Sequence, residues 1–228
     1  MRFIDSAYVK HIAQINPNYE ITEEVVDGVM FFHIDNVLLY PDEFTHYLKE
    51  SFPVGSSYDW DIDQAPGKRQ WIPSIWVKPL QDFYHSFCRE AFFNWGTNIY
   101  NGNMPVRRQN YLPHTDEASH VFNLWLNKEA LGGTAFYRCT RFNPEGDPSA
   151  RSAYGGGYEF WKEFYTRDQR EEPWRCFKGD SDWHLYHIAE MKYNRVSVYD
   201  GWLWHAAYIE PEWYTEEDRY SLVAVDVS

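Results

Sequence analysis

The sequence has 228 residues, of which 19% are aromatic and 11 are tryptophan, which excludes an intrinsically disordered chain and predicts one domain over residues 1–228. The formal net charge of −13 disfavours binding to nucleic acid or to an anionic membrane surface, because both need clustered basic side chains. The three cysteines share no CxxC spacing, no stretch of about 18 apolar residues occurs, and the N-terminus lacks a signal-peptide pattern. We therefore expect a cytoplasmic protein without a disulfide framework or a membrane span.

The first predicted elements are a β-hairpin and a short helix. Two apolar stretches within residues 23–40 flank Asp27-Gly28, a dipeptide typical of two-residue hairpin turns. Pro41 precedes two acidic residues, and this combination favours the first turn of a helix.

Residues 78–96 carry the clearest helical pattern in the sequence. Apolar side chains recur every three or four residues, as expected for one buried helix face. Pro79 is expected to open this helix and Gly96 to close it. The predicted buried face consists of Leu80, Phe83, Tyr84, Phe87, Cys88, Ala91, Phe92 and Trp95.

After residue 100 the sequence changes to short aromatic or β-branched stretches separated by turn residues, which are typical of strands. Helices followed by many strands favour a mainly β protein with flanking helices, a β-sandwich or jelly roll braced by N-terminal helices. The predicted strands lie within residues 104–112, 120–127, 132–138, 194–200, 202–210 and 219–227.

A long segment, residues 139–187, interrupts these strands. It contains three consecutive glycines and a predicted helix over residues 158–172. Connections of this length in a compact domain are usually lids or binding loops, so we expect a lid-like insertion. The alternative is a peripheral insertion that only covers a sheet edge.

One histidine-carboxylate pair has the spacing of a metal site. His114 and Asp116 lie two apart, so a strand continuing through them would point both side chains to one face. His205, on a predicted strand far along the chain, would complete the set of two histidines and one carboxylate that non-haem Fe(II) uses. Trp202 and Trp204 are expected on the opposite face of that strand, in the core. The H-x-D pattern alone arises often by chance, so this prediction depends on the third ligand.

Three other histidines compete for the same role. His184 and His187 have helical spacing, but no carboxylate or cysteine follows at ligand spacing. His120 is expected at the start of the next strand. We interpret all three as ordinary surface or core histidines.

A second pair of polar residues two apart lies on the last predicted strand. Arg219 and Ser221 would face the same side, and a guanidinium beside a hydroxyl is suited to binding a carboxylate in a buried site. Because an arginine is costly to bury without an anion, the pair predicts either a bound carboxylate or an internal one. The chain has 34 acidic residues, so an internal salt bridge is the simpler alternative.

The ordered set H-T-D, a distant histidine and R-x-S resembles the Fe(II)- and 2-oxoglutarate-dependent oxygenase superfamily, in particular its prolyl-hydroxylase-like branch. Further likenesses are "FFHIDNVLLYPDEF", "LNKEALGGTAFYR", "NRVSVYDGWLWHAAYI" and "DRYSLVAVD". The resemblance covers residues 31–51, 100–138 and 190–227, whereas the segment 139–187 has no counterpart.

This resemblance implies a double-stranded β-helix, which is a cupin-like jelly roll, and a role for each matching residue. His114, Asp116 and His205 would bind Fe(II), and Arg219 would pair with the distal carboxylate of 2-oxoglutarate, assisted by Ser221. A tyrosine upstream of the H-x-D motif often shares that carboxylate in the superfamily. Tyr111 and Tyr100 are both candidates here. One of Arg107 and Arg108 could face the pocket, although a solvated strand face is expected for at least one of them.

The implied activity is a dioxygenase reaction in which 2-oxoglutarate and O₂ are consumed and succinate and CO₂ are released. An unactivated C–H bond of a small molecule, an amino acid or a peptidyl residue would be hydroxylated. Asp116 favours hydroxylation over halogenation, since related halogenases have a small residue in its place. The alternatives are a cupin-like metalloenzyme that does not use 2-oxoglutarate and a non-catalytic jelly-roll binding module; the oligomeric state is left open.

Overall fold

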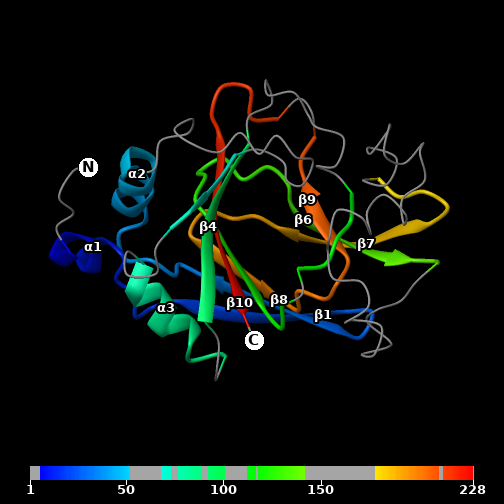
Figure 1. Ribbon diagram of the computed structural model, residues 1–228, viewed down its shortest axis with the longest axis horizontal. Coiled ribbons are helices and arrows are strands. Elements are labelled where there is room, and N and C mark those ends of the chain that lie inside the picture. The colour runs from blue at the N-terminus through cyan, green and yellow to red at the C-terminus, as the bar shows by residue number, and fades with distance from the viewer. Residues whose placement is uncertain are drawn as a thin grey trace.

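In the part of the chain that it describes, the computed structural model contains two antiparallel β-sheets and three short helices (Figure 1). The prediction of a mainly β protein with few helices is therefore confirmed. The structure describes residues 6–51, 68–72, 77–88, 92–100, 112–116, 118–141, 178–210 and 213–227.

The larger sheet has seven strands in the order β1-β2-β8-β5-β10-β4-β3. Its two longest strands, β4 and β10, pair over their full length, from Phe92 opposite Val227 to Tyr100 opposite Arg219. The strands of this sheet are β1 (Glu20–Val26), β2 (Val29–Asp35), β3 (Lys68–Trp71), β4 (Phe92–Tyr100), β5 (Val121–Trp125), β8 (Arg195–Tyr199) and β10 (Arg219–Val227).

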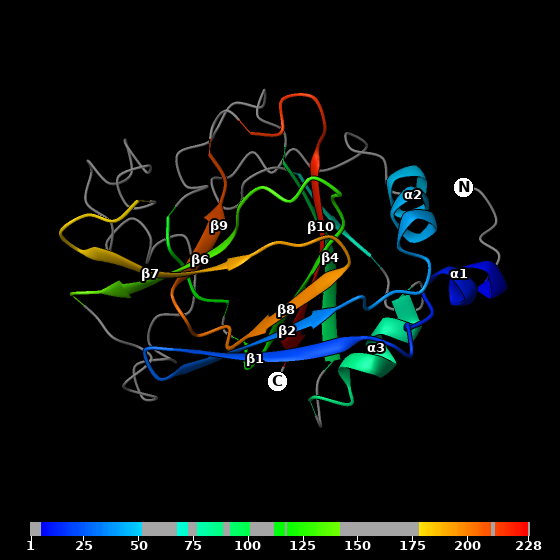
Figure 2. The same ribbon diagram turned by 180° about the vertical axis from the view of Figure 1, so that it is seen from behind.

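The smaller sheet has three strands in the order β7-β6-β9 and lies on the side of the large sheet away from the helices (Figures 1 and 2). Its strands are β6 (Gly133–Cys139), β7 (Trp183–Glu190) and β9 (His205–Tyr208). Since β6 ends at Cys139 and β7 begins at Trp183, both ends of the segment predicted as an insertion, 139 and 183–187, belong to strands instead. The predicted helix over 158–172 lies outside the described residues.

The hairpin and the helix predicted near the N-terminus are confirmed. β1 and β2 join through Asp27 (φ 51°) and Gly28 (φ 79°), so both turn residues occupy the left-handed region. A two-residue turn of this kind matches the twist of paired strands, which explains the Asp-Gly sequence. Helix α2 (Pro41–Ser51) begins at Pro41, and α1 (Ser6–Ile12) was not anticipated.

The long helix predicted over residues 78–96 is wrong beyond its first two turns. Helix α3 (Lys78–Tyr84) ends early, and β4 begins at Phe92. Of the β4 side chains that the structure describes, Phe93 and Trp95 are both buried, two apart as in a strand. The partner strand β10 begins 119 positions after β4 ends, so a local sequence pattern does not contain the pairing that decides this conformation.

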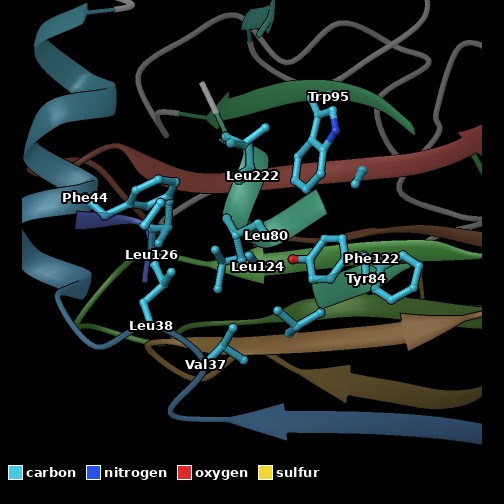
Figure 3. Packing of buried hydrophobic residues seen from close by; sticks show 14 of the residues in the cluster. Val37, Leu38, Phe44, Leu80, Tyr84, Trp95, Phe122, Leu124, Leu126 and Leu222 are labelled. Atoms are coloured by element: carbon cyan, nitrogen blue, oxygen red, sulfur yellow. The ribbon is translucent and has the colours of Figure 1, made fainter. Parts of the chain in front are cut away.

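The main hydrophobic core lies between the three helices and the large sheet (Figure 3). Tyr84 of α3 stacks between Phe122 and Trp95, with ring centroids 4.3 and 5.3 Å away. Leu222 of β10 and Phe44 of α2 pack in the same cluster. Burial of these side chains fixes one face of the large sheet against the helices.

A second core fills the space between the two sheets. It joins Phe31 and Val121 of the large sheet to Phe136 and Ala189 of the small one. In β10, Tyr220 and Leu222 belong to the helix side, so the alternate residues Arg219 and Ser221 point toward the small sheet. Strand β10 therefore places polar side chains in the space between the two sheets.

None of the helices in the described part of the chain is long and apolar enough to cross a membrane.

Candidate metal centre

The backbone brings His114 and His205 side by side, although 91 positions separate them in the sequence. His114 N–H donates to the carbonyl of His205 at 2.8 Å, and His205 N–H donates to the carbonyl of His114 at 2.9 Å. This reciprocal pair forms an isolated β-bridge beside β9. The two imidazole centroids are 4.5 Å apart.

Asp116 reaches the same place by a different route from the one predicted. A strand through both residues was expected, but within 112–116 only His114 makes a β-bridge. Asp116 N–H instead donates to the carbonyl of Gly201 at 2.7 Å. A Cβ at position 201 would lie 2.7 Å from the carbonyl oxygen of Ala118, so only glycine allows this close approach.

These three side chains converge on one small volume. Their ligand atoms all lie within 4.8 Å of one another. Nε2 of His114 is 3.8 Å from one carboxylate oxygen of Asp116, and Nε2 of His205 is 3.3 Å from the other. Nitrogen and oxygen donors at these separations match ligands that share one divalent ion, since metal–ligand bonds of roughly 2.0–2.2 Å place neighbouring ligands about 3 Å apart.

Both histidines are oriented for binding through Nε2. Nδ1–H of His205 donates to the carbonyl of Leu203 at 2.9 Å, and Nδ1–H of His114 donates to that of Leu112 at 3.2 Å. A carbonyl oxygen can only accept, so each contact places the ring proton on Nδ1 and leaves the Nε2 lone pair available.

The three ligands differ in their exposure to solvent. The His205 side chain is 5% exposed and packs beside Tyr199 and Phe136, with ring centroids 5.1 and 6.2 Å away. The side chains of His114 and Asp116 are 26% and 20% exposed. The centre therefore has a buried side, formed by His205 and the inter-sheet core, and a partly exposed side, formed by His114 and Asp116.

Arg219 is buried between the sheets, on the first residue of β10. It is 4% exposed, and its guanidinium lies 4.7 Å above the ring of Trp125. Its Nη2 donates to the carbonyl of Gly133 on β6 at 3.3 Å, so the side chain spans from the large sheet to the small one. The predicted burial of Arg219 is confirmed by its exposed fraction.

Ser221, also predicted, lies on the same inner face and is 1% exposed. Its hydroxyl has no hydrogen-bond partner among the described residues, and neither does the side-chain oxygen of Asn123 on the neighbouring strand β5. Asn123 was missed in the sequence, where only its alternation with Phe122 and Leu124 signals an inward-facing polar group. Buried polar atoms that the chain leaves unsatisfied are the expected lining of a polar ligand site.

The structure does not describe the side chains of four predicted residues. Tyr111, Arg107 and Arg108 lie outside the described residues, and for Tyr100 only the backbone of β4 is described. The prediction that both tryptophans flanking Leu203 pack in the core is correct for Trp204, which is 2% exposed, but not for Trp202, which is half-buried.

The fold and the site define a mainly β protein with a candidate mononuclear metal centre. The chain belongs to the protein family described as "Family of unknown function (DUF6445)", whose model matches residues 16–221. A search of curated proteins finds no match to the sequence.

Three solved structures are similar to the chain at low sequence identity. AviO1 from Streptomyces viridochromogenes Tue57 has 9% identity and a TM-score of 0.44, over 100% of this chain and 97% of its own. An oxidoreductase of the 2OG-Fe(II) oxygenase family from Burkholderia pseudomallei has 11% identity and a TM-score of 0.38, over 81% and 78%. IDO from Bacillus thuringiensis has 11% identity and a TM-score of 0.39, over 82% and 97%. These similarities are too weak to assign an activity.

Proposed function

We propose that the protein is a non-haem Fe(II)- and 2-oxoglutarate-dependent dioxygenase that hydroxylates an unactivated C–H bond of a small molecule, an amino acid or a peptidyl residue. The observation that carries this proposal is the convergence of His114, Asp116 and His205 within 4.8 Å, beside a sheet whose inner face presents the buried Arg219. A metal trio alone would fit many enzymes. An inward-facing guanidinium adds a site for an anionic co-substrate.

The donor set fits Fe(II). Two neutral imidazoles and one carboxylate occupy one side of the ion and leave its other positions open for exogenous ligands. The Nδ1–H contacts of His205 and His114 to backbone carbonyls hold both rings in the required tautomer. Such orientation is what distinguishes a ligand histidine from one that merely lies near a carboxylate.

In this proposal the two sheets are the walls of a double-stranded β-helix of the jelly-roll type. The large sheet contributes Arg219 and Ser221 through β10, and the small sheet contributes His205 through β9. The segment predicted as a lid-like insertion, residues 139–187, has no counterpart in the superfamily, and its proposed role as a lid over the substrate rests on the length of this connection.

Arg219 is proposed to hold the distal carboxylate of 2-oxoglutarate. A guanidinium can donate two parallel hydrogen bonds to a carboxylate, and that of Arg219 lies 4.7 Å from the centroid of the Trp125 ring. The hydroxyl of Ser221 and the side-chain oxygen of Asn123 are buried polar groups on the same face, and the Ser221 hydroxyl is suited to a third hydrogen bond. Tyr111, with Tyr100 as the alternative, is proposed as a further contact to the same carboxylate.

Bound Fe(II), with 2-oxoglutarate and O₂, supplies the oxidising power for C–H hydroxylation, and succinate and CO₂ are the by-products. The chain's own part is to fix geometry and exclude water. Tyr199 and Phe136 close the buried side of His205, which keeps solvent from that face of the centre. The more exposed His114 and Asp116 lie toward the side where the substrate would enter.

The test is succinate release by the purified protein with Fe(II), ascorbate and 2-oxoglutarate. We expect slow uncoupled turnover without substrate and no turnover for His114→Ala or Asp116→Ala. His184→Ala is the matched control, because His184 is an exposed histidine on β7 and should leave turnover unchanged. The variants should also lose bound iron, measured by elemental analysis.

Two results would reject the proposal. Iron binding without any effect of 2-oxoglutarate on the visible spectrum of the anaerobic Fe(II) protein would indicate a cupin-like metalloenzyme instead. A stable, folded protein that binds no iron would indicate a non-catalytic binding module.

A further inference from the structure

A second cluster of metal-ligand residues lies apart from the centre described above and shares no residue with it. Glu24 of β1, His33 of β2 and His187 of β7 each offer a ligand atom, and these atoms lie within 4.8 Å of one another. The three strands belong to both sheets, so the cluster joins the β1–β2 hairpin to the edge of the small sheet. The proposed oxygenase function does not use it.

His187 is the least explained member of the cluster. Its side chain is 10% exposed, and its Nε2 is buried without a hydrogen bond to any described residue. The ring packs against Phe31 and Phe136, whose centroids are 4.5 and 5.8 Å from it. A buried ring nitrogen that makes no hydrogen bond to a described residue is available to bind a metal ion.

His33 is oriented by its other ring nitrogen. Its Nδ1 lies 3.3 Å from the hydroxyl of Ser197, and that hydroxyl also accepts the indole N–H of Trp125 at 3.2 Å. Nε2 of His33 is thereby directed to Glu24, 3.1 Å away. A histidine held through Nδ1 with Nε2 facing a carboxylate has the arrangement of a supported metal ligand.

We propose that Glu24, His33 and His187 form a Zn²⁺ site, with water as the fourth ligand. In a tetrahedral site with bonds of about 2.0–2.1 Å, neighbouring ligand atoms are about 3.3 Å apart. The shared oxygen of Glu24 lies 3.1 Å from Nε2 of His33 and 3.6 Å from Nε2 of His187. Two neutral imidazoles and one carboxylate suit zinc, whose affinity for such ligands is high.

An ion pair between Glu24 and His33 without a metal explains fewer of these contacts than a metal site does. Glu24 with a protonated His33 needs no third group and leaves the buried Nε2 of His187 unsatisfied, which costs free energy. The group of Cys88, His120 and Asp226 shows the contrast. There the backbone N–H and Nδ1 of His120 satisfy both oxygens of Asp226, so its contacts are explained without a metal.

The experiment is a Zn²⁺ titration of the full-length chain after removal of metal with a chelator. The His114→Ala/His205→Ala background removes the first centre from the count. In this background, Glu24→Gln and His187→Gln should each lose one equivalent of bound Zn²⁺ or weaken its binding at least tenfold. Co²⁺ bound to the same background should show the visible absorption of four-coordinate cobalt, and His187→Gln should abolish it.

Matched controls lie on the same strands. Glu23 is an exposed carboxylate next to Glu24, and His184 is an exposed histidine of β7, so Glu23→Gln and His184→Gln should bind Zn²⁺ as the background does. Glu24 is 43% exposed at its side chain, so Glu24→Gln should fold normally, as checked by its circular dichroism and unfolding midpoint without metal. Equal stoichiometry and affinity in Glu24→Gln, His187→Gln and the background would overturn the proposal.

Discussion

At the scale of single residues, the H-x-D motif predicts a metal site only together with a further ligand far along the chain. His114 and Asp116 lie beside His205 because of a backbone bridge and a hydrogen bond to Gly201, neither of which the H-x-D pattern contains. The identities of these residues were readable from the sequence. Their convergence depends on how strands far apart in the sequence are placed.

Arg219 gives the sharpest test at this scale. Arg219→Lys keeps the positive charge but loses the two parallel donors, so 2-oxoglutarate should bind roughly 30-fold more weakly, equivalent to about 2 kcal/mol. Iron binding should stay intact, because Arg219 is not among the three ligands. The measurement is an anaerobic titration of the Fe(II) protein with 2-oxoglutarate.

Arg138 provides the control for this substitution. It lies over the ring of Tyr186, 4.1 Å from its centroid, and Arg138→Lys should not alter 2-oxoglutarate binding. If Arg219→Lys bound 2-oxoglutarate as tightly as the unaltered protein, Arg219 would be an internal structural group.

At the scale of elements, α3 and β4 show where local patterns fail. Phe92 and Trp95 match a helical repeat, but the backbone of both lies in β4, which pairs with β10 over nine residues. This pairing outweighs the helical preference of the segment.

Tyr84, at the end of α3, allows a stability prediction. Its hydroxyl is fully buried without a hydrogen-bond partner among the described residues, and burial raises the pKa of its phenol. Tyr84→Phe keeps the stacked ring and removes the unsatisfied group, so the free energy of unfolding should rise by about 1 kcal/mol.

Tyr84→Ala is the matched comparison, and it should lower the free energy of unfolding by about 3–5 kcal/mol through loss of the packed ring. Chemical denaturation measures both. A loss of stability in Tyr84→Phe would show that the hydroxyl has a partner.

Asp35, at the end of β2, joins two strands of the large sheet. It is buried, which raises its pKa, but hydrogen bonds from Arg195 and Lys192 prevail and lower the pKa from 3.8 to about 2. A lowered pKa means that the ion pair stabilises the fold above about pH 4 and that this stabilisation is lost as the pH falls toward 2.

Asp35→Asn should therefore lower the free energy of unfolding by about 1–2 kcal/mol at pH 7 and by progressively less between pH 4 and pH 2. Urea denaturation across this pH range measures the effect. Asp82→Asn is the control, because Asp82 forms an exposed pair with Lys78 within α3 and should matter little. A constant difference across the pH range would show that Asp35 acts through packing.

At the scale of the whole molecule, the proposed ligands bind between the sheets and should stabilise the fold. With Mn²⁺ in place of Fe(II), 2-oxoglutarate at about 100 times its dissociation constant should add about 2.7 kcal/mol and raise the melting temperature by roughly 5–10 °C. The measurement is thermal unfolding followed by circular dichroism. His114→Ala should abolish the increase that depends on metal, whereas the exposed His184→Ala should retain it.

The two candidate sites are also connected through the inter-sheet space. Ser197 contacts both His33 and Trp125, and Trp125 lies beneath Arg219. A substitution in the second cluster can therefore affect 2-oxoglutarate binding without contacting 2-oxoglutarate. For this reason the second cluster is tested by metal stoichiometry and not by turnover.

The sequence by itself determined the mainly β class, the β1–β2 hairpin, the start of α2 and the residue types of the candidate centre, because these depend on composition, turn chemistry and spacing within a few residues. It also predicted a buried Arg219, since the strand pattern around it alternates. Only the tertiary structure decided that β4 is a strand, that Asp116 reaches His205 through Gly201, and that His187 meets Glu24 and His33. Each of these depends on pairing or packing between segments far apart in the chain, and no local pattern records which segments will meet.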